Sequence, residues 1–183
     1  MANAYDVADF FIDLAKYDEN ETITNMRINK LLYFSQAWHM VRHNTPLFDE
    51  DFEAWDYGPV VPCIYQKYKD NGKNNICTIS KDYSSDIFTD DEMDTLLDVA
   101  KYYKQFSTPN LVEKTHMKGT PWDLAYQKGK NIIIDKMSIC LYFKKEIPLD
   151  NFAIPKYFYD TAYCGKRNDD GILILPKEFD EDE

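Results

Sequence analysis

Hydrophobic residues recur at every third or fourth position in the first part of the chain, a spacing that predicts two amphipathic helices. Asn3 is placed to cap the first helix, and Thr24 to cap the second, which covers about residues 25–43. The apolar positions of the second helix extend around most of its circumference, so we expect it to be central and buried, with Trp38 in the core. The apolar residues of the two helices are Val7, Phe10, Phe11, Leu14, Ile28, Leu31, Leu32, Phe34, Ala37, Trp38 and Val41.

The spacing changes to two at residues 52–57, which alternate in the order Phe-Glu-Ala-Trp-Asp-Tyr. This alternation predicts a short strand or an extended bend. Gly58 and Pro59 then form a corner, where we expect Gly58 to adopt a positive φ. Pro62 stands where the first turn of a helix tolerates proline, so a third helix is predicted to begin there and to stop at Gly72.

Shorter elements are predicted after residue 72. The segment 77–80, Cys-Thr-Ile-Ser, is a candidate edge strand, and residues 89–92, Thr-Asp-Asp-Glu, match a capping box at the start of a helix. The apolar stripe of that helix is expected to be Met93, Leu96, Leu97, Ala100 and Tyr103. The remaining predicted elements are a helix from Thr108, a helix from Thr120 to Gly129, a strand over 132–134 and a helix after Asp135.

Together these elements predict a mainly α fold, a single compact helical domain with a minor short β element, over residues 3–146. The chain has 183 residues, of which 44% are hydrophobic and 15% aromatic, so a sizeable core can form. Residues 147–183 carry an aromatic cluster, one apolar run and the acidic end EFDEDE. We expect this segment to be a C-terminal appendage with a solvated acidic tail.

The net charge of −11 at pH 7 argues against nucleic acid as a partner, because nucleic-acid binding relies on Lys and Arg that neutralise phosphates. A basic partner would instead be attracted. No secretory signal and no run long enough to cross a membrane is visible, so we expect a cytoplasmic protein without a membrane partner. The four cysteines are far apart and include no C-x-x-C pair, which is typical of reduced thiols.

Two groups of residues are candidates for chemistry. His39 and His43 are four residues apart on one helix, as two metal ligands would be, but Met40 stands where a metalloprotease carries its general-base Glu. A third ligand would have to come from His116 or a carboxylate, so we interpret the pair as ordinary surface or capping histidines. Cys63 lies in a first helical turn that could lower a thiol pKa, but its apolar neighbours are typical of a packed cysteine. We therefore predict no enzyme activity, no catalytic residue, no cofactor and no metal.

Several blocks of the sequence occur in a specific combination. They are Lys30–His39 (KLLYFSQAWH), Pro46–Phe48 (PLF) and Ala54–Val60 (AWDYGPV), followed by the weaker landmarks Pro121–Trp122 and Ile134–Phe143. This combination resembles the Panacea domain family, which includes SocA-like antitoxins and many phage- or prophage-associated proteins. The resemblance covers about residues 3–146.

The resemblance implies a non-enzymatic antitoxin that binds and neutralises a cognate toxin, usually encoded beside it. One branch of the family resembles a proteolytic adapter, which delivers the toxin to an ATP-dependent protease. An alternative is a phage- or prophage-encoded interaction protein that acts on a host factor without a toxin partner. A DNA-binding autoregulator would need a basic helix, which the sequence does not show.

The segment EAWDYGPVV has a structural interpretation. In this interpretation Trp55, Gly58 and Pro59 hold a corner against the helix that carries Trp38. Trp122 is expected to be a further structural residue of the same motif. The expected position of Trp55 is inside the fold.

The same segment also has a functional interpretation. Its exposed members Asp56 and Tyr57, together with Tyr65, are predicted to form part of a partner-binding surface. Tyrosine and tryptophan are the residue types that carry most binding energy at interfaces. The two interpretations are compatible if Tyr57 lies at the rim of the corner.

Overall fold

The computed structural model describes residues 2–18 and 21–146, which form seven α-helices, two short 3₁₀-helices and one three-stranded sheet. The helices are α1 (Ala4–Ala15), α2 (Asn25–His43), α3 (Pro62–Tyr68), α4 (Asp90–Tyr103), α5 (Thr108–His116), α6 (Pro121–Ala125) and α7 (Lys136–Glu146), with η1 (Lys69–Asn71) and η2 (Ser85–Ile87). The strands are β1 (Phe52–Trp55), β2 (Gly58–Val60) and β3 (Ile132–Ile134). The predicted mainly α fold with a minor β element is confirmed. The appendage and acidic tail predicted for 147–183 lie outside the described residues.

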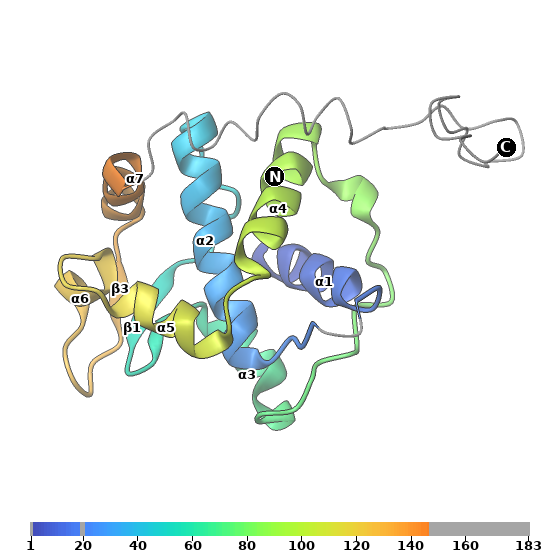
Figure 1. Ribbon diagram of the computed structural model, residues 1–183, viewed down its shortest axis with the longest axis horizontal. Coiled ribbons are helices and arrows are strands. Elements are labelled where there is room, and N and C mark those ends of the chain that lie inside the picture. The colour runs from blue at the N-terminus through green and yellow to red at the C-terminus, as the bar shows by residue number, and fades with distance from the viewer. Residues whose placement is uncertain (1, 19–20, 147–183) are drawn as a thin grey trace, which may run out of the picture. The chain divides into compact units, whose positions relative to one another are not determined.

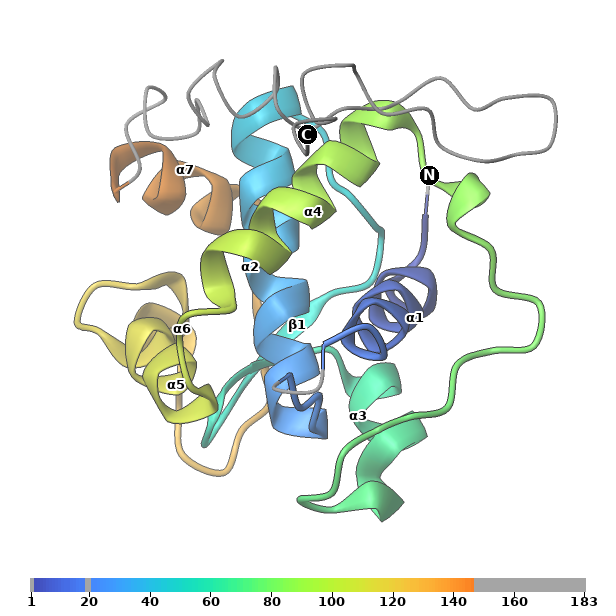
Figure 2. The same ribbon diagram turned by 45° about the vertical axis from the view of Figure 1, so that its right-hand side comes forward.

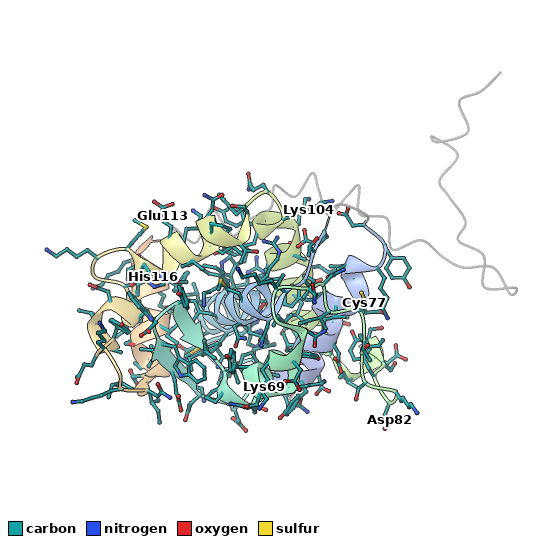
Figure 3. The ribbon with its side chains drawn as sticks, turned by 90° about the horizontal axis from the view of Figure 1, so that it is seen from below. Lys69, Cys77, Asp82, Lys104, Glu113 and His116 are labelled. Carbon is teal, nitrogen blue, oxygen red and sulfur yellow. The ribbon has the colours of Figure 1, made fainter. Side chains whose placement is uncertain are left out.

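Helix α2 is the centre of the described domain. Residues 27–41 are all buried, and α1, α3, α4, α5 and α7 all pack against this helix. In Figures 1 and 2 it runs between the other helices, and Figure 3 shows it nearly end-on from below. The prediction of a central helix with a buried Trp38 is confirmed. Because these residues have almost no contact with water, the polar ones among them must find partners inside the protein.

Polar side chains of α2 hold the backbone of the loops around it. Gln36 accepts hydrogen bonds from the N–H groups of Leu47 and Phe48 at 2.9 and 3.2 Å, and donates to the carbonyl oxygen of Phe48 at 3.0 Å. Arg27 donates to the carbonyl oxygen of Phe106 at 2.8 Å. These bonds satisfy backbone groups that no helix or strand pairs. The loops before β1 and after α4 are therefore fixed to the central helix.

The three strands form an antiparallel sheet in the order β2-β1-β3. Phe52 and Ala54 of β1 are fully buried, whereas the positions between and after them are only partly buried. The predicted alternation is therefore confirmed, because successive side chains of a strand point to opposite faces. A two-residue turn joins β1 to β2 and places Trp55 opposite Gly58.

Two predicted elements differ from the structure. The segment 77–80 is not a strand: its neighbour Ile76 donates one backbone hydrogen bond to Ile23 at 2.8 Å, and the residues that follow are mostly exposed. Without a buried face, such a segment has nothing to hold it in a ladder. Helix α6 ends at Ala125 rather than at Gly129, because the chain turns back in an isolated bridge and Gly129 adopts a φ of 74°.

Helix α4 begins at the predicted capping box, but its buried face is rotated from the predicted stripe. Leu97 is 45% exposed, whereas Thr95 and Asp98 are buried. Asp98 accepts a hydrogen bond from Arg42 of α2 at 2.6 Å, so its burial depends on a partner from another element. In the sequence, a polar residue that is buried through such pairing cannot be told from one that faces water, because most charged residues are exposed.

Candidate functional site

The turn between β1 and β2 is tightly constrained. Gly58 has a φ of 103°, which confirms the expected positive value. A Cβ atom on Gly58 would lie 2.8 Å from Cε and Nζ of Lys30 and 2.8 Å from Oγ1 of Thr115. Both the backbone angle and the available space therefore require glycine here. In Figure 3 this hairpin lies between the labelled residues His116 and Lys69, on the face seen from below.

Lys30 of α2 occupies the space beside Gly58. Its side chain is almost fully buried and donates from Nζ to the carbonyl oxygen of Pro59 at 3.0 Å. Burial disfavours the charged ammonium group and lowers the pKa of Lys30 to about 7. Lysine is rarely buried without a partner, and the Pro59 carbonyl group is the partner in this site.

Two asparagines of α2 extend this attachment. Asn29 accepts a hydrogen bond from the N–H group of Val61 at 2.9 Å and donates to the carbonyl oxygen of Asn25 at 2.9 Å. Asn25 in turn donates to the carbonyl oxygen of Tyr65 at 2.9 Å. Strand β2 and helix α3 are therefore fixed to α2 through their backbones. Because Pro59 has no N–H group and its carbonyl group is bonded to Lys30, β2 does not offer an open strand edge at this residue.

The other side of the turn is held by α5, α6 and the residue after α6. Trp122 donates from Nε1 to the carbonyl oxygen of Trp55 at 2.8 Å, and Nε2 of His116 lies 3.2 Å from the carbonyl oxygen of Asp56. Tyr126 donates from its hydroxyl group to the Asp56 carboxylate at 2.9 Å, and this bond raises the pKa of Tyr126. The ring of Trp122 contacts those of His116 and Tyr126, with centroids 3.7 and 4.6 Å apart. The turn is thus held from both sides.

A groove of about 460 Å³ lies beside the turn. The rings of Trp55 and Tyr65 form its apolar wall, with centroids 4.8 Å apart. Tyr57, at the tip of the turn, is 67% exposed, and Asp56 is also exposed. The structure therefore brings the three predicted partner-binding residues, Asp56, Tyr57 and Tyr65, to one groove. Their role in binding stays a prediction.

The expected inward position of Trp55 is wrong. Trp55 is half-buried on the outer face of β1, because strand alternation places it opposite the two buried residues of that strand. Its Nε1 donates to the carboxylate of Glu53 at 2.7 Å. Trp38 contacts the rings of Tyr102 and Tyr103 of α4 instead. Trp55 is thus a wall of the groove rather than a part of the core.

The candidate chemical residues are distributed differently from the prediction. His39 is buried rather than at the surface, and burial together with the nearby His43 lowers its pKa to about 4. His116, the suggested third ligand, lies at the hairpin turn. Within residues 2–18 and 21–146, no group of three His, Cys, Asp or Glu side chains could hold a metal ion. Cys63 is half-buried at the start of α3, and its hydrogen bond with Tyr5 raises the pKa of Tyr5.

Sequence reasoning missed Lys30, His116 and Tyr126 at the turn, and Lys69 and Lys130 at the groove. Lys30 carries a signal, since it is a charged residue inside a helix that is apolar on most sides. His116, Tyr126 and Lys130 come from a segment far from the hairpin in the chain, and Lys69 follows the next helix, so local periodicity does not connect them with the turn. Across the described helices, none is long and apolar enough to cross a membrane.

The fold and the site define a class of small, mainly α domain in which a buried central helix fixes a surface hairpin beside a groove. The chain belongs to the family Antitoxin SocA-like, Panacea domain, which matches residues 28–123. This match confirms the resemblance found in the sequence, and its span includes most of α2, the hairpin and Trp122.

Antitoxin SocA of Caulobacter vibrioides (strain NA1000 / CB15N) is 32% identical to this chain over 120 residues. The aligned part covers 60% of this chain and 64% of that protein, so the chain spans less than two thirds of this curated relative. No solved structure matches the chain.

Proposed function

We propose that this protein is an antitoxin that binds and neutralises a cognate toxin encoded beside it. Membership of the SocA-like family and the identity to Antitoxin SocA support an antitoxin role. The hairpin and its groove supply a contact surface, because Asp56, Tyr57 and Tyr65 lie together there. The proposal assigns no enzymatic step to the protein.

The observation that carries the proposal is the exposure of Tyr57 on a turn that is held on both sides. The ring of Tyr57 is 67% exposed, while the backbone next to it is bonded to Trp122 and, through Pro59, to Lys30. An aromatic side chain on a fixed backbone loses little conformational entropy when it binds. A turn with only a structural role does not need an exposed aromatic ring at its tip.

Neutralisation could follow two routes after binding. In the first, the antitoxin covers the active surface of the toxin. In the second, it acts as a proteolytic adapter and delivers the toxin to an ATP-dependent protease. The lifetime of the toxin separates the routes: a covered toxin persists in cells that grow, whereas a delivered toxin disappears unless the protease is inactivated.

Co-expression with each neighbouring gene tests the proposal. One neighbour is expected to stop growth alone and to allow growth when this protein is present. Tyr57→Ala should lose this rescue, whereas Tyr17→Ala, which removes an 83% exposed ring beyond α1, should keep it. The proposal is refuted if no neighbour is toxic and suppressed, or if Tyr57→Ala rescues as fully as the natural protein.

A further inference from the structure

The groove beside the hairpin differs in charge from the chain as a whole. The chain has a net charge of −11, but the charged residues that line the groove are Lys30, Lys69, Lys130 and Asp56. The carboxylate of Asp56 already accepts a hydrogen bond from Tyr126 at 2.9 Å. A basic groove on an acidic protein favours one acidic segment locally, since the surrounding field repels such a segment elsewhere.

Basic groups lie both in the buried part of the groove and at its exposed rim. Lys30 lines the groove from a buried position, where Nζ donates to the carbonyl oxygen of Pro59 and where burial lowers its pKa to about 7, so its amine is only partly charged at neutral pH. Lys69, in η1, and Lys130, in the turn before β3, are exposed at the rim. The apolar ring of Trp55 lines the groove as well. The groove therefore combines positive charge with an apolar wall.

We propose that the groove binds an acidic segment of the partner protein in which carboxylates flank an apolar side chain. The carboxylates pair with Lys69 and Lys130 at the rim, while the apolar side chain packs on Trp55 and Tyr65. This inference rests on the proposed function, because the partner is then the toxin and the segment is its contact region. It reverses the expectation from net charge alone, which favours a basic partner.

Selection from a library of short random peptides displayed on phage tests the inference. The natural protein is expected to select peptides in which Asp or Glu flank an aromatic or aliphatic residue. Binding of the selected peptides should weaken about tenfold or more in the double variant Lys69→Glu/Lys130→Glu. The control Lys81→Glu/Lys145→Glu makes the same change in charge at two exposed lysines outside the groove, and should bind as the natural protein does. Thermal unfolding checks that both double variants are folded.

Three results would overturn the inference: a basic consensus, the absence of any selected peptide, or equal binding by the two double variants. The selection needs no toxin, so its result is independent of the growth assay. Acidic peptides bound by a protein that rescues no cells would support the groove inference and refute the antitoxin proposal. Rescue of growth combined with a basic consensus among the selected peptides would support the antitoxin proposal and refute the groove inference.

Discussion

The ammonium nitrogen of Lys30 lies 3.0 Å from the carbonyl oxygen of Pro59. This contact joins the KLLY block of the central helix to the GPV block of the hairpin, and it passes through the space beside Gly58. Two of the sequence blocks that resemble the family are therefore two halves of one contact. The absence of a Cβ atom at Gly58 allows it to form.

Gly58→Val is expected to lower the free energy of unfolding by about 2 to 4 kcal/mol, because the new side chain meets both a positive φ and the Lys30 side chain. Gly119→Val is the matched control, since Gly119 also has a positive φ, but among the described residues no atom other than those of Gly119 and its two chain neighbours lies within 4 Å of the position that a Cβ atom would take there. Chemical denaturation of both variants measures the difference. Equal losses would show that the contact with Lys30 adds nothing beyond backbone strain.

Lys30 should make stability depend on pH. Its pKa is about 7 in the folded protein and ordinarily 10.5, so between these values the unfolded chain holds a proton that the folded protein does not. The free energy of unfolding should therefore rise with pH in this window, by about 1 kcal/mol per pH unit. Burial raises the pKa values of Tyr33, Tyr68 and Tyr103, and this opposes the rise above pH of about 10.

Lys30→Met removes the titrating group and keeps an unbranched side chain of similar length. The difference in unfolding free energy between the natural protein and this variant should grow in favour of the natural protein from pH 7 to 9. Urea denaturation at several pH values measures this difference. A constant difference would mean that the pKa of Lys30 is not lowered in the folded protein.

The helices were predictable because their signals are local. The caps at Asn3, Thr24 and Thr89 and the apolar spacing each lie within a few residues of the element they define. The inward position expected for Trp55 is wrong because Trp55 lies at a strand position that alternates with the buried Phe52 and Ala54 and therefore points to the other face. In a short strand, the alternation of positions is therefore a better guide to which side chains are buried than the hydrophobicity of each residue.

The groove and the face of α4 were not predictable, because both depend on pairs between distant segments. Lys69 and Lys130 meet at one groove although they are far apart in the chain. Asp98 is buried because Arg42 reaches it from another helix. Periodicity describes one element at a time and contains no information on which polar residue another element will satisfy.

Trp122→Phe should weaken the attachment of the hairpin turn to α6. The variant keeps an aromatic ring but removes the Nε1 donor, which leaves the carbonyl group of Trp55 without this bond. The expected loss is about 1 to 2 kcal/mol of unfolding free energy. Thermal unfolding measures it, and an unchanged melting temperature would show that the bond contributes nothing.

Trp38→Ala should lower the unfolding free energy by about 3 to 5 kcal/mol, because the ring is buried between α2 and α4. Trp55→Ala offers a comparison at a half-buried tryptophan and should cost clearly less. Denaturant titration of both variants gives the ranking. The reverse order would place Trp55, not Trp38, in the core.

Tyr57→Ala should leave the unfolding free energy within about 1 kcal/mol, since most of the ring is exposed. Under the antitoxin proposal it should weaken toxin binding by about 2 kcal/mol. Calorimetric titration with the toxin found by co-expression measures the binding, with Tyr17→Ala as the matched control. A Tyr57→Ala variant that unfolds would show that the ring belongs to the structural corner.

Two of the bonds that hold the turn end on backbone carbonyl oxygens, which every amino acid possesses. Trp122 and His116 reach the carbonyl oxygens of Trp55 and Asp56, so neither bond depends on the side chain at Tyr57. A substitution at Tyr57 changes what the loop presents and leaves the support of its backbone in place. During evolution such a protein can change its partner through a single substitution at Tyr57, without first acquiring mutations that restore the fold.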